Sequence, residues 1–287
     1  MASSQPTQGQ WASISAVVCH AGADCVGERW VVANPSQLAR LIAIIAMGQV
    51  SQASHIVTKL VPAAPAFSFQ ALRSEAIVKL TVQDEDQTPR IGYPRWQRDG
   101  FIFEAISWIA ARQSNGPAVI MKDPHVSSTT QGLDGLMIAL APDKSAIETT
   151  TIFEDKCTDN PKGMFASNVM PGFQARHDNK RSAEIIATAS ALLVRAGIAD
   201  RDAAILAAGV TDRARRRYRA AVTTVAALDS DPARADIFAP YGKLAGIGVH
   251  QRVAACLIVS DNLRPWFDEL AILAVDYLST LVDDLNV

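Results

Sequence analysis

The chain has 287 residues, with 27 basic and 29 acidic side chains and a formal net charge of −2. Hydrophobic residues make up 49% and charged residues 20%, a composition that excludes a chain disordered throughout, a collagen and a coiled coil. The near balance of charge excludes a protein that coats nucleic acid by bulk charge, so any polyanion must be met by a local patch.

The sequence predicts no contact with a membrane. Its longest apolar run is residues 41–48, far short of the roughly 20 residues that span a bilayer. Residues 1–10 are polar and uncharged, unlike a signal peptide, and predict a flexible tail. Four cysteines without a CxxC pair indicate neither a disulfide framework nor a zinc site, so we expect a reducing, cytoplasmic location. These are Cys19, Cys25, Cys157 and Cys256.

The first ninety residues predict an α/β subdomain. Strand-like patterns cover residues 14–20 and 29–33, and Asn34-Pro35-Ser36 is typical of a helix start. A buried helix is predicted over 37–60, and the β-branched residues of 75–83 predict a third strand.

A polar stretch, residues 84–90, predicts a surface loop and a boundary between subdomains. The division is then an N-terminal α/β subdomain, 11–90, and a core with C-terminal helices, 91–287. One continuous domain is the alternative.

The middle of the chain predicts a helix over 98–113 and a short buried strand over 118–121. Residues 133–141 and 146–157 read as two strands of a β-hairpin, because Pro142-Asp143-Lys144-Ser145 has the residue types of a turn.

The last part of the chain is alanine-rich and predicts mainly helices. We expect a loop over 158–181, whose last residues overlap the start of the next predicted helix. Three helices, one strand and a closing helix follow it. The fold class is therefore α/β, with α+β as the alternative: a mixed central sheet flanked by helices, with a helical C-terminal portion. The helices are predicted over 180–195, 200–209, 211–228 and 263–285, and the strand over 245–260.

The strongest chemical signal lies on the predicted hairpin. Glu154 and Lys156 stand two residues apart at the end of a strand and so point to the same face. A carboxylate beside an ammonium suits a metal site with a positioned lysine, since Mg²⁺ takes one or two carboxylates together with water and substrate phosphate. A solvated strand end is the alternative reading.

Hairpin register decides whether Asp134 can join this pair. A turn centred on Asp143-Lys144 places Asp134 opposite Phe153, next to Glu154 but on the wrong face by one residue. The three side chains therefore meet only if the hairpin carries a bulge or an odd-length loop.

This arrangement resembles the PD-(D/E)xK nuclease superfamily, which has the restriction-endonuclease-like fold. The resemblance covers residues 98–195, about a third of the chain. It implies that Asp134 and Glu154 hold Mg²⁺ or Mn²⁺ and that Lys156 positions the attacking water. Many members add a carboxylate on the preceding helix, and Glu104 is the candidate. The sequence departs from the family pattern at Leu133, where a proline is usual.

Basic residues predict the contacts with nucleic acid. Lys180 and Arg181 lie shortly after the motif, and a dense arginine run follows thirty residues later. A solvated or salt-bridged surface is the alternative reading for both groups. The arginines singled out as phosphate contacts are Arg213, Arg216, Arg217 and Arg219.

Together these features predict a Mg²⁺-dependent nuclease acting on DNA. Nucleases of this kind occur in bacterial antiphage systems, such as the nuclease subunit of the Hachiman system, beside a helicase or ATPase. A partner of that kind is therefore expected, whereas the oligomeric state is left open. The alternatives are a catalytically silent binding or scaffold subunit, and an RNase using the same site.

Overall fold

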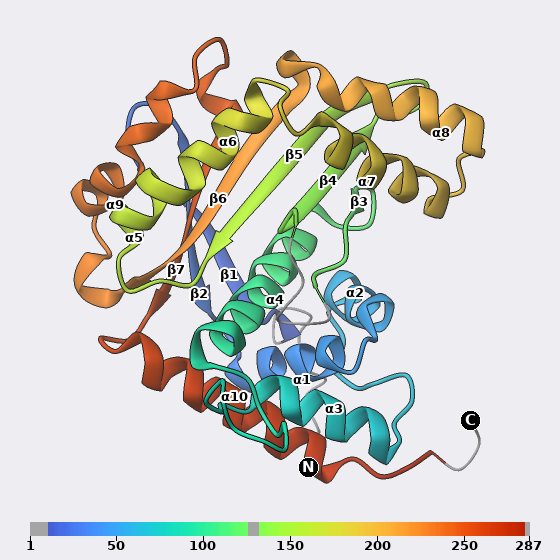
Figure 1. Cartoon of the computed structure of the whole chain (residues 1–287), viewed down its shortest axis with the longest axis vertical. Helices are drawn as coiled ribbons and strands as arrows, with labels where there is room; N and C mark the ends of the chain where they lie inside the picture. The colour runs from blue at the N-terminus through green and yellow to red at the C-terminus, as the bar shows by residue number, and fades with distance from the viewer. Residues whose placement is uncertain (1–10, 126–131, 285–287) are drawn as a thin grey trace, which may run out of the picture.

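The computed structural model describes residues 11–125 and 132–284, so the predicted tail, 1–10, lies outside the described residues. A seven-stranded mixed sheet runs through the molecule, with helices on both of its faces (Figure 1). This confirms the predicted mixed α/β class. Among the described residues, no helix is both long and apolar enough to cross a membrane.

The sheet has four parallel strands at its centre and antiparallel strands at its edges. The carboxyl ends of the parallel strands share one edge, where open α/β sheets form their ligand crevices. In spatial order the strands are β1 (Ile14–Cys19), β2 (Val26–Val32), β7 (Arg252–Val259), β6 (Arg216–Val225), β5 (Ile147–Lys156), β4 (Gly135–Leu140) and β3 (Ile120–Met121).

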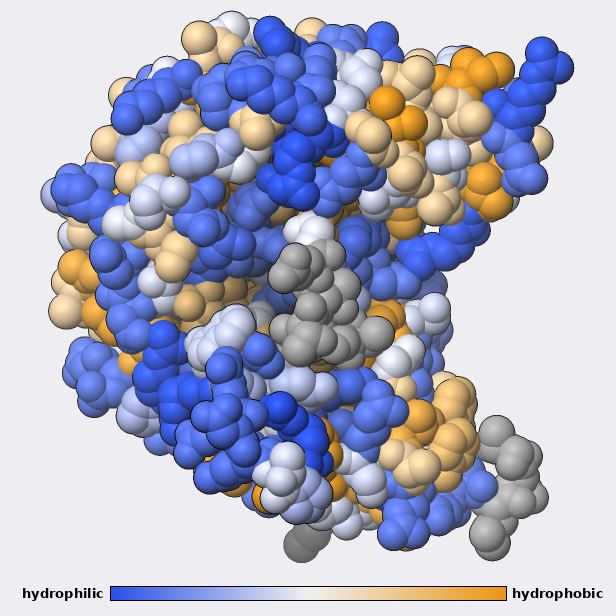
Figure 2. Space-filling view, in the orientation of Figure 1, coloured by the Kyte–Doolittle hydropathy of each residue, from blue (hydrophilic) through white to orange (hydrophobic). Residues whose placement is uncertain are grey.

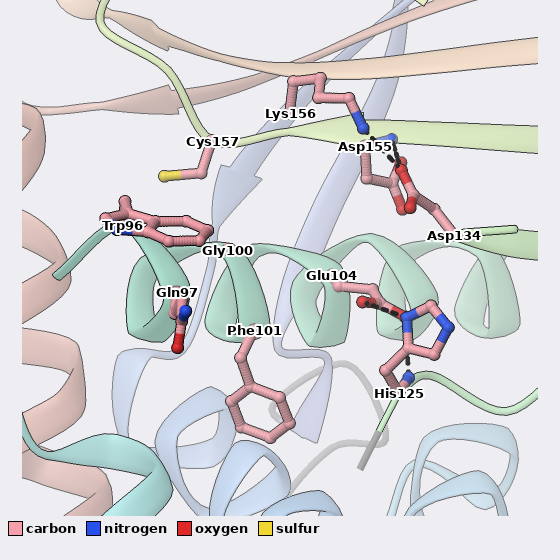
Figure 3. Close-up of a pocket in the computed structure, with 10 residues that line it drawn as sticks. All are labelled: Trp96, Gln97, Gly100, Phe101, Glu104, His125, Asp134, Asp155, Lys156 and Cys157. Atoms are coloured by element: carbon pink, nitrogen blue, oxygen red, sulfur yellow. Dashed lines mark hydrogen bonds and ion pairs between the residues drawn. The ribbon is translucent and has the colours of Figure 1, made fainter. Parts of the chain in front are cut away.

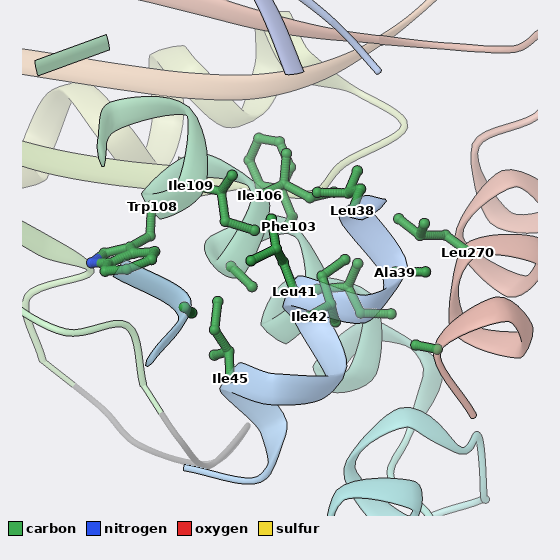
Figure 4. Close-up of a cluster of buried hydrophobic side chains, with 14 of the residues drawn as sticks. Leu38, Ala39, Leu41, Ile42, Ile45, Phe103, Ile106, Trp108, Ile109 and Leu270 are labelled. Carbon is green, nitrogen blue, oxygen red and sulfur yellow. The ribbon is translucent and has the colours of Figure 1, made fainter. Parts of the chain in front are cut away.

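Two layers of helices cover the sheet, each around its own hydrophobic cluster. Figure 4 shows the first cluster, where Leu38, Phe103 and Leu270 bring three helices together. The first layer contains α1 (Pro35–Ala46), α2 (Val50–Lys59), α3 (Gln70–Leu80), α4 (Arg95–Asn115) and α10 (Leu263–Thr280). The second contains α5 (Pro161–Met164), α6 (Met170–His177), α7 (Ser182–Arg195), α8 (Asp200–Ala207) and α9 (Asp231–Phe238).

Short non-α turns complete the chain. A π-helical segment, η2 (Phe165–Val169), joins α5 to α6. The 3₁₀ turns are η3 (Ala208–Thr211), η4 (Arg213–Arg215), η5 (Ala226–Leu228), η6 (Ala239–Lys243) and η7 (Val249–Gln251). In Figure 2 the surface is mostly hydrophilic, with hydrophobic residues gathered over α7 and α8, where Ile205 is exposed.

Strand β6 corrects the helix predicted over 211–228. It is buried on both faces, since Ala220 and Val222 belong to one hydrophobic cluster and Ala221 to the other. A central parallel strand shows no alternation of polar and apolar residues, because neither face meets water. An alanine-rich run of this kind therefore has the composition of a helix.

Three other predictions were wrong. Residues 75–83, predicted as a strand, fall largely in helix α3. The helix predicted over 37–60 is two helices, because the chain turns at Gly48, which has a φ of +80°. Residues 158–181, predicted as a loop, form α5, η2 and α6.

The hairpin of β4 and β5 carries a bulge, one of the two conditions under which Asp134 would join Glu154 and Lys156. Ala139 pairs with Thr149, whereas Leu140 pairs with Ile147, so β5 has one extra residue at that point. From the bulge to Gly135, which pairs with Phe153, each residue of β4 pairs one position further along β5 than it would in a hairpin without the bulge. Gly135 is required there, because a Cβ would lie 2.5 Å from the Phe153 ring. The shift brings the preceding residue, an aspartate, level with the carboxyl end of β5.

Candidate functional site

Asp134, Glu154 and Lys156 meet at the carboxyl end of β5. The Lys156 ammonium Nζ lies 2.9 Å from Asp134 Oδ2 and 3.1 Å from Glu154 Oε2. The backbone N–H of Asp155 also donates to Asp134 Oδ2, at 2.9 Å. The structure therefore brings together the three residues on which the predicted metal site depends.

The charges of this cluster shift one another's protonation. Burial alone would lower the pKa of Lys156, but the attraction of Asp134 and Glu154 outweighs burial, and the pKa lies above its ordinary value. The pKa of Glu154 is also raised, first by burial and then by the negative charge of Asp134. Lys156 is thus a firmly held cation between two carboxylates.

Glu154 is fixed from behind by Arg176 on α6. The Arg176 side chain is 1% exposed, and its guanidinium donates to Glu154 Oε1. Helix α6 comes close at this point, since a Cβ on Gly172 would lie 3.3 Å from the Arg176 guanidinium and 3.6 Å from Glu154 Oε1. The loop predicted over 158–181 includes Arg176, but in the structure this residue lies in a helix and is a buried counter-ion.

Asp134 and Lys156 line a cavity of about 260 Å³ between the end of β5 and helix α4 (Figure 3). Its other charged or ionisable walls come from Glu104, His125 and Asp155. Glu154 is not a lining residue; it contacts the cavity wall through Lys156, whose Nζ lies 3.1 Å from Glu154 Oε2. The remaining lining residues are Trp96, Gln97, Gly100, Phe101 and Cys157.

Glu104 lies in the predicted place but has a different partner. It accepts the backbone N–H of His125 at 2.8 Å, and its Oε2 lies 3.0 Å from His125 Nδ1. The other ring nitrogen of His125 is 3.1 Å from the Lys122 ammonium. Glu104 therefore shares the cavity with Asp134, while its role as a metal ligand stays a prediction.

Asp155 is a site residue that sequence reasoning missed. It points toward α4, is buried, and pairs with Arg219 at 3.3 Å. Burial raises its pKa to about 7, against the opposing effect of Arg219. Arg219 itself lies over the Phe153 ring, 3.6 Å from its centroid, and near Trp30. The available signal was strand alternation, which turns the middle residue of Glu154-Asp155-Lys156 to the opposite face.

Two of the arginines predicted to contact DNA are buried. Arg216 is 0% exposed and donates to the carbonyl oxygens of Val210 and Arg176. Arg219 is 5% exposed and is held by the contacts described above. Both predictions were wrong, because side chains enclosed by protein partners cannot reach a phosphate.

The other predicted basic contacts are exposed, and those at the start of β6 are distant from the cluster. Lys180, Arg181, Arg213 and Arg217 are at the surface. Arg216, beside two of them, pairs with Thr150 in β5, six residues before Lys156. At about 3.3 Å per residue, the start of β6 is roughly 20 Å from the cluster.

His177, near the same end of the sheet, is also internal. Its ring nitrogens lie 3.1 Å from the Tyr218 hydroxyl and 2.9 Å from the carbonyl oxygen of Ala245. Burial lowers its pKa. In this position a neutral imidazole packs α6 against the sheet.

The donor set at the end of β5 fits Mg²⁺. Asp134 and Glu154 supply hard oxygen ligands, and their oxygens bonded to Lys156 are at most 6.0 Å apart because each lies close to one Nζ. In the part of the chain that the structure describes, no three His, Cys, Asp or Glu side chains form a ready ligand group. Water and substrate oxygens would therefore complete the shell, as is usual for this ion.

Comparison with protein-family models, with curated protein sequences and with solved structures gives no significant match. The functional argument therefore starts from the geometry of the cavity and from the motif residues that converge on it.

Proposed function

We propose that this chain is a metal-dependent nuclease that hydrolyses phosphodiester bonds in DNA, with Mg²⁺ or Mn²⁺ held by Asp134 and Glu154. One observation carries the proposal: Asp134, Glu154 and Lys156, from two strands, meet at the carboxyl end of β5 beside an open cavity. The bulge that aligns them shifts the hairpin register by one residue. Bulges of this kind often re-aim side chains next to active sites.

Bound Mg²⁺ would supply charge neutralisation at the phosphate and would lower the pKa of a water molecule. Lys156 balances the charge of the two carboxylates and, through its ammonium protons, orients the attacking water. Arg176 and the backbone N–H of Asp155 hold Glu154 and Asp134 in place. The site is thus positioned before substrate arrives.

We further propose that the protein acts in the cytoplasm as the effector of a bacterial antiphage system, beside a helicase or ATPase. All four cysteines are free thiols, which supports a reducing compartment. The exposed Arg213 and Arg217, at the start of β6, lie roughly 20 Å from the cluster, a strand's length of six residues. This separation supports a substrate that contacts the protein at two places, the cluster and the start of β6, and that a partner helps to hold there.

A catalytically silent scaffold is the second candidate, and one observation favours it. Lys156 already neutralises both carboxylates, and Arg176 completes the ion-pair chain. Such a chain can stabilise a fold without metal. Metal binding separates the two functions, because a scaffold stabilised by this chain of ion pairs needs no divalent ion.

The test compares cleavage of plasmid DNA, linear DNA and RNA in Mg²⁺ by the wild type, Glu154→Gln and Lys156→Met. Glu148→Gln is the matched control, since Glu148 is exposed on the same strand. We expect both site variants to lose cleavage about 100-fold or more, as for groups that act in the transition state, and the control to stay active. Calorimetry should show Mg²⁺ or Mn²⁺ binding that Glu154→Gln weakens.

Equal cleavage by all four proteins would exclude this site. An inactive wild type that also binds no divalent ion supports the scaffold. Cleavage of RNA but not DNA supports the RNase reading.

A further inference from the structure

The proposed hydrolysis uses only one end of the cavity, and the other end has a different chemistry. Figure 3 shows Trp96 at the far end from Asp134, beside Cys157 and the start of α4. The Trp96 side chain is 64% exposed, although large aromatic side chains are normally among the more buried residues. Packing does not explain why an exposed indole lines a cavity that also carries acidic residues.

Helix α4 presents one continuous wall to this cavity. Trp96, Gly100 and Glu104 stand at a spacing of four residues and therefore lie on one stripe of the helix. At 1.5 Å per residue the stripe runs about 12 Å, from the indole to the carboxylate end. Gln97 adds an amide, which can both donate and accept a hydrogen bond.

Gly100 keeps this wall bare. Glycine is among the least favourable residues inside a helix, and Gly100 is the sixth residue of α4. A Cβ built on Gly100 has no neighbouring atom within 4 Å. Neither backbone conformation nor close packing requires the glycine, and any side chain at this position would enter the cavity.

We infer that the cavity receives one unpaired nucleobase, stacked on Trp96 over the bare turn at Gly100, with its phosphate toward Asp134 and Lys156. This rests on the proposed nuclease function and deepens it, because it names the substrate as a DNA strand with an unpaired nucleotide at the scissile position. Aromatic platforms bind bases with little sequence preference, since every base has a π face. The cavity, at about 260 Å³, is smaller than pockets for drug-sized ligands, which begin near 300 Å³. A base within a duplex has both faces stacked on its neighbours, so only an unpaired, unstacked base can lie on Trp96.

The first test measures binding without cleavage. A labelled 20-nucleotide single strand and its duplex are titrated by fluorescence anisotropy in EDTA. Loss of one base–aromatic stack weakens binding by about 5- to 150-fold, which we expect for Trp96→Ala on the single strand, with Trp96→Phe retaining most of the affinity. Ile205→Ala, an exposed apolar residue on α8, is the control and should bind as the wild type does.

Gly100 supplies a second, independent variant. Gly100→Leu places a side chain in the cavity and should weaken single-strand binding to a similar degree, while Gly100→Ala changes binding less. Both should melt at or above the wild-type temperature, because each replaces a glycine inside a helix. A loss of binding in Gly100→Leu therefore cannot come from unfolding.

Abasic oligonucleotides identify the stacked base. An abasic nucleotide at the stacking position should weaken wild-type binding by the same factor as Trp96→Ala and should have little further effect on Trp96→Ala. Unchanged affinity in both Trp96→Ala and Gly100→Leu overturns the inference, whether or not the wild type cleaves DNA. An equal Trp96→Ala effect on single strand and duplex also overturns it. Absence of metal-dependent cleavage, with binding that depends on Trp96, overturns the nuclease function but not the base site.

Discussion

Replacing Arg176 by methionine tests how Glu154 is held in the cluster. The substitution keeps the apolar stem of a side chain that is 1% exposed but removes the guanidinium that donates to Glu154 Oε1. Removing one partner of a buried ion pair costs about 3–5 kcal/mol, because the other charge stays buried without its counter-ion. Lys156 remains beside Glu154 and reduces this cost.

Protonation of Glu154 sets an upper limit to the penalty. Its ordinary pKa is 4.5, so at pH 7 the carboxyl takes up a proton at a cost of about 3 kcal/mol, and at pH 5.5 at about 1 kcal/mol. Loss of Arg176 raises the folded-state pKa of Glu154 further. A raised carboxyl pKa destabilises the folded state above the ordinary pKa, so the penalty grows from about pH 4.5 upward.

The assay is urea unfolding in EDTA, followed by far-UV circular dichroism at pH 5.5 and pH 7. We expect Arg176→Met to lose at most about 3 kcal/mol at pH 7 and at most about 1 kcal/mol at pH 5.5, because the raised pKa of Glu154 makes proton uptake cheaper than at its ordinary pKa. In the Glu154→Gln background the same substitution should cost less and lose its pH dependence. Arg201→Met, at an exposed position of α8, should change little. An equal penalty at both pH values would refute the reasoning.

Three further predictions concern residues outside this pair. Arg219→Met should destabilise the fold by about 1–2 kcal/mol at pH 8 and by less at pH 6, because the pKa of Asp155 is about 7 and only its charged form is left unpaired. Arg217→Met, at an exposed position, should change stability by less than about 0.5 kcal/mol at either pH; thermal melts at both pH values compare the two. Burial lowers the pKa of His177, so the unfolded chain takes up the proton first and folding stability should fall as the pH drops below about 6.5. The urea midpoint of the wild type should therefore drop between pH 7.5 and pH 5.5, and the drop should be smaller in His177→Gln. If Arg213 and Lys180 contact phosphates, each alanine variant should lower the slope of log affinity against log salt by about 1, and an unchanged slope in both would exclude them from the interface.

The hairpin and its motif could be predicted because their geometry is local. The residue types of the turn, the alternation along β5 and the need for a bulge follow from a segment of about 25 residues. Within such a segment, register alone decides which side chains meet. Asp134, Glu154 and Lys156 could thus be grouped from sequence on the condition of a bulge or an odd-length loop, and the structure supplies the bulge.

Features that depend on distant partners could not be predicted in this way. β6 lies between β5 and β7, and only that place in the sheet explains why its alanines form a strand. Arg219 was read as a surface cation because arginine is usually exposed. Its counter-ion is Asp155, sixty-four residues earlier, on the next strand.

The end of β5 is held by counter-ions from both sides. Glu154 points to one face and is fixed by Arg176, while Asp155 points to the other and is fixed by Arg219. Because each carboxylate is buried with its own arginine, the strand end cannot rotate or slip without exposing or unpairing a charge. Trp96, in contrast, stands on the first turn of α4 and is largely exposed. Variants at the arginines should therefore lose stability and cleavage together, whereas variants at Trp96 should lose affinity for DNA in a protein that melts normally.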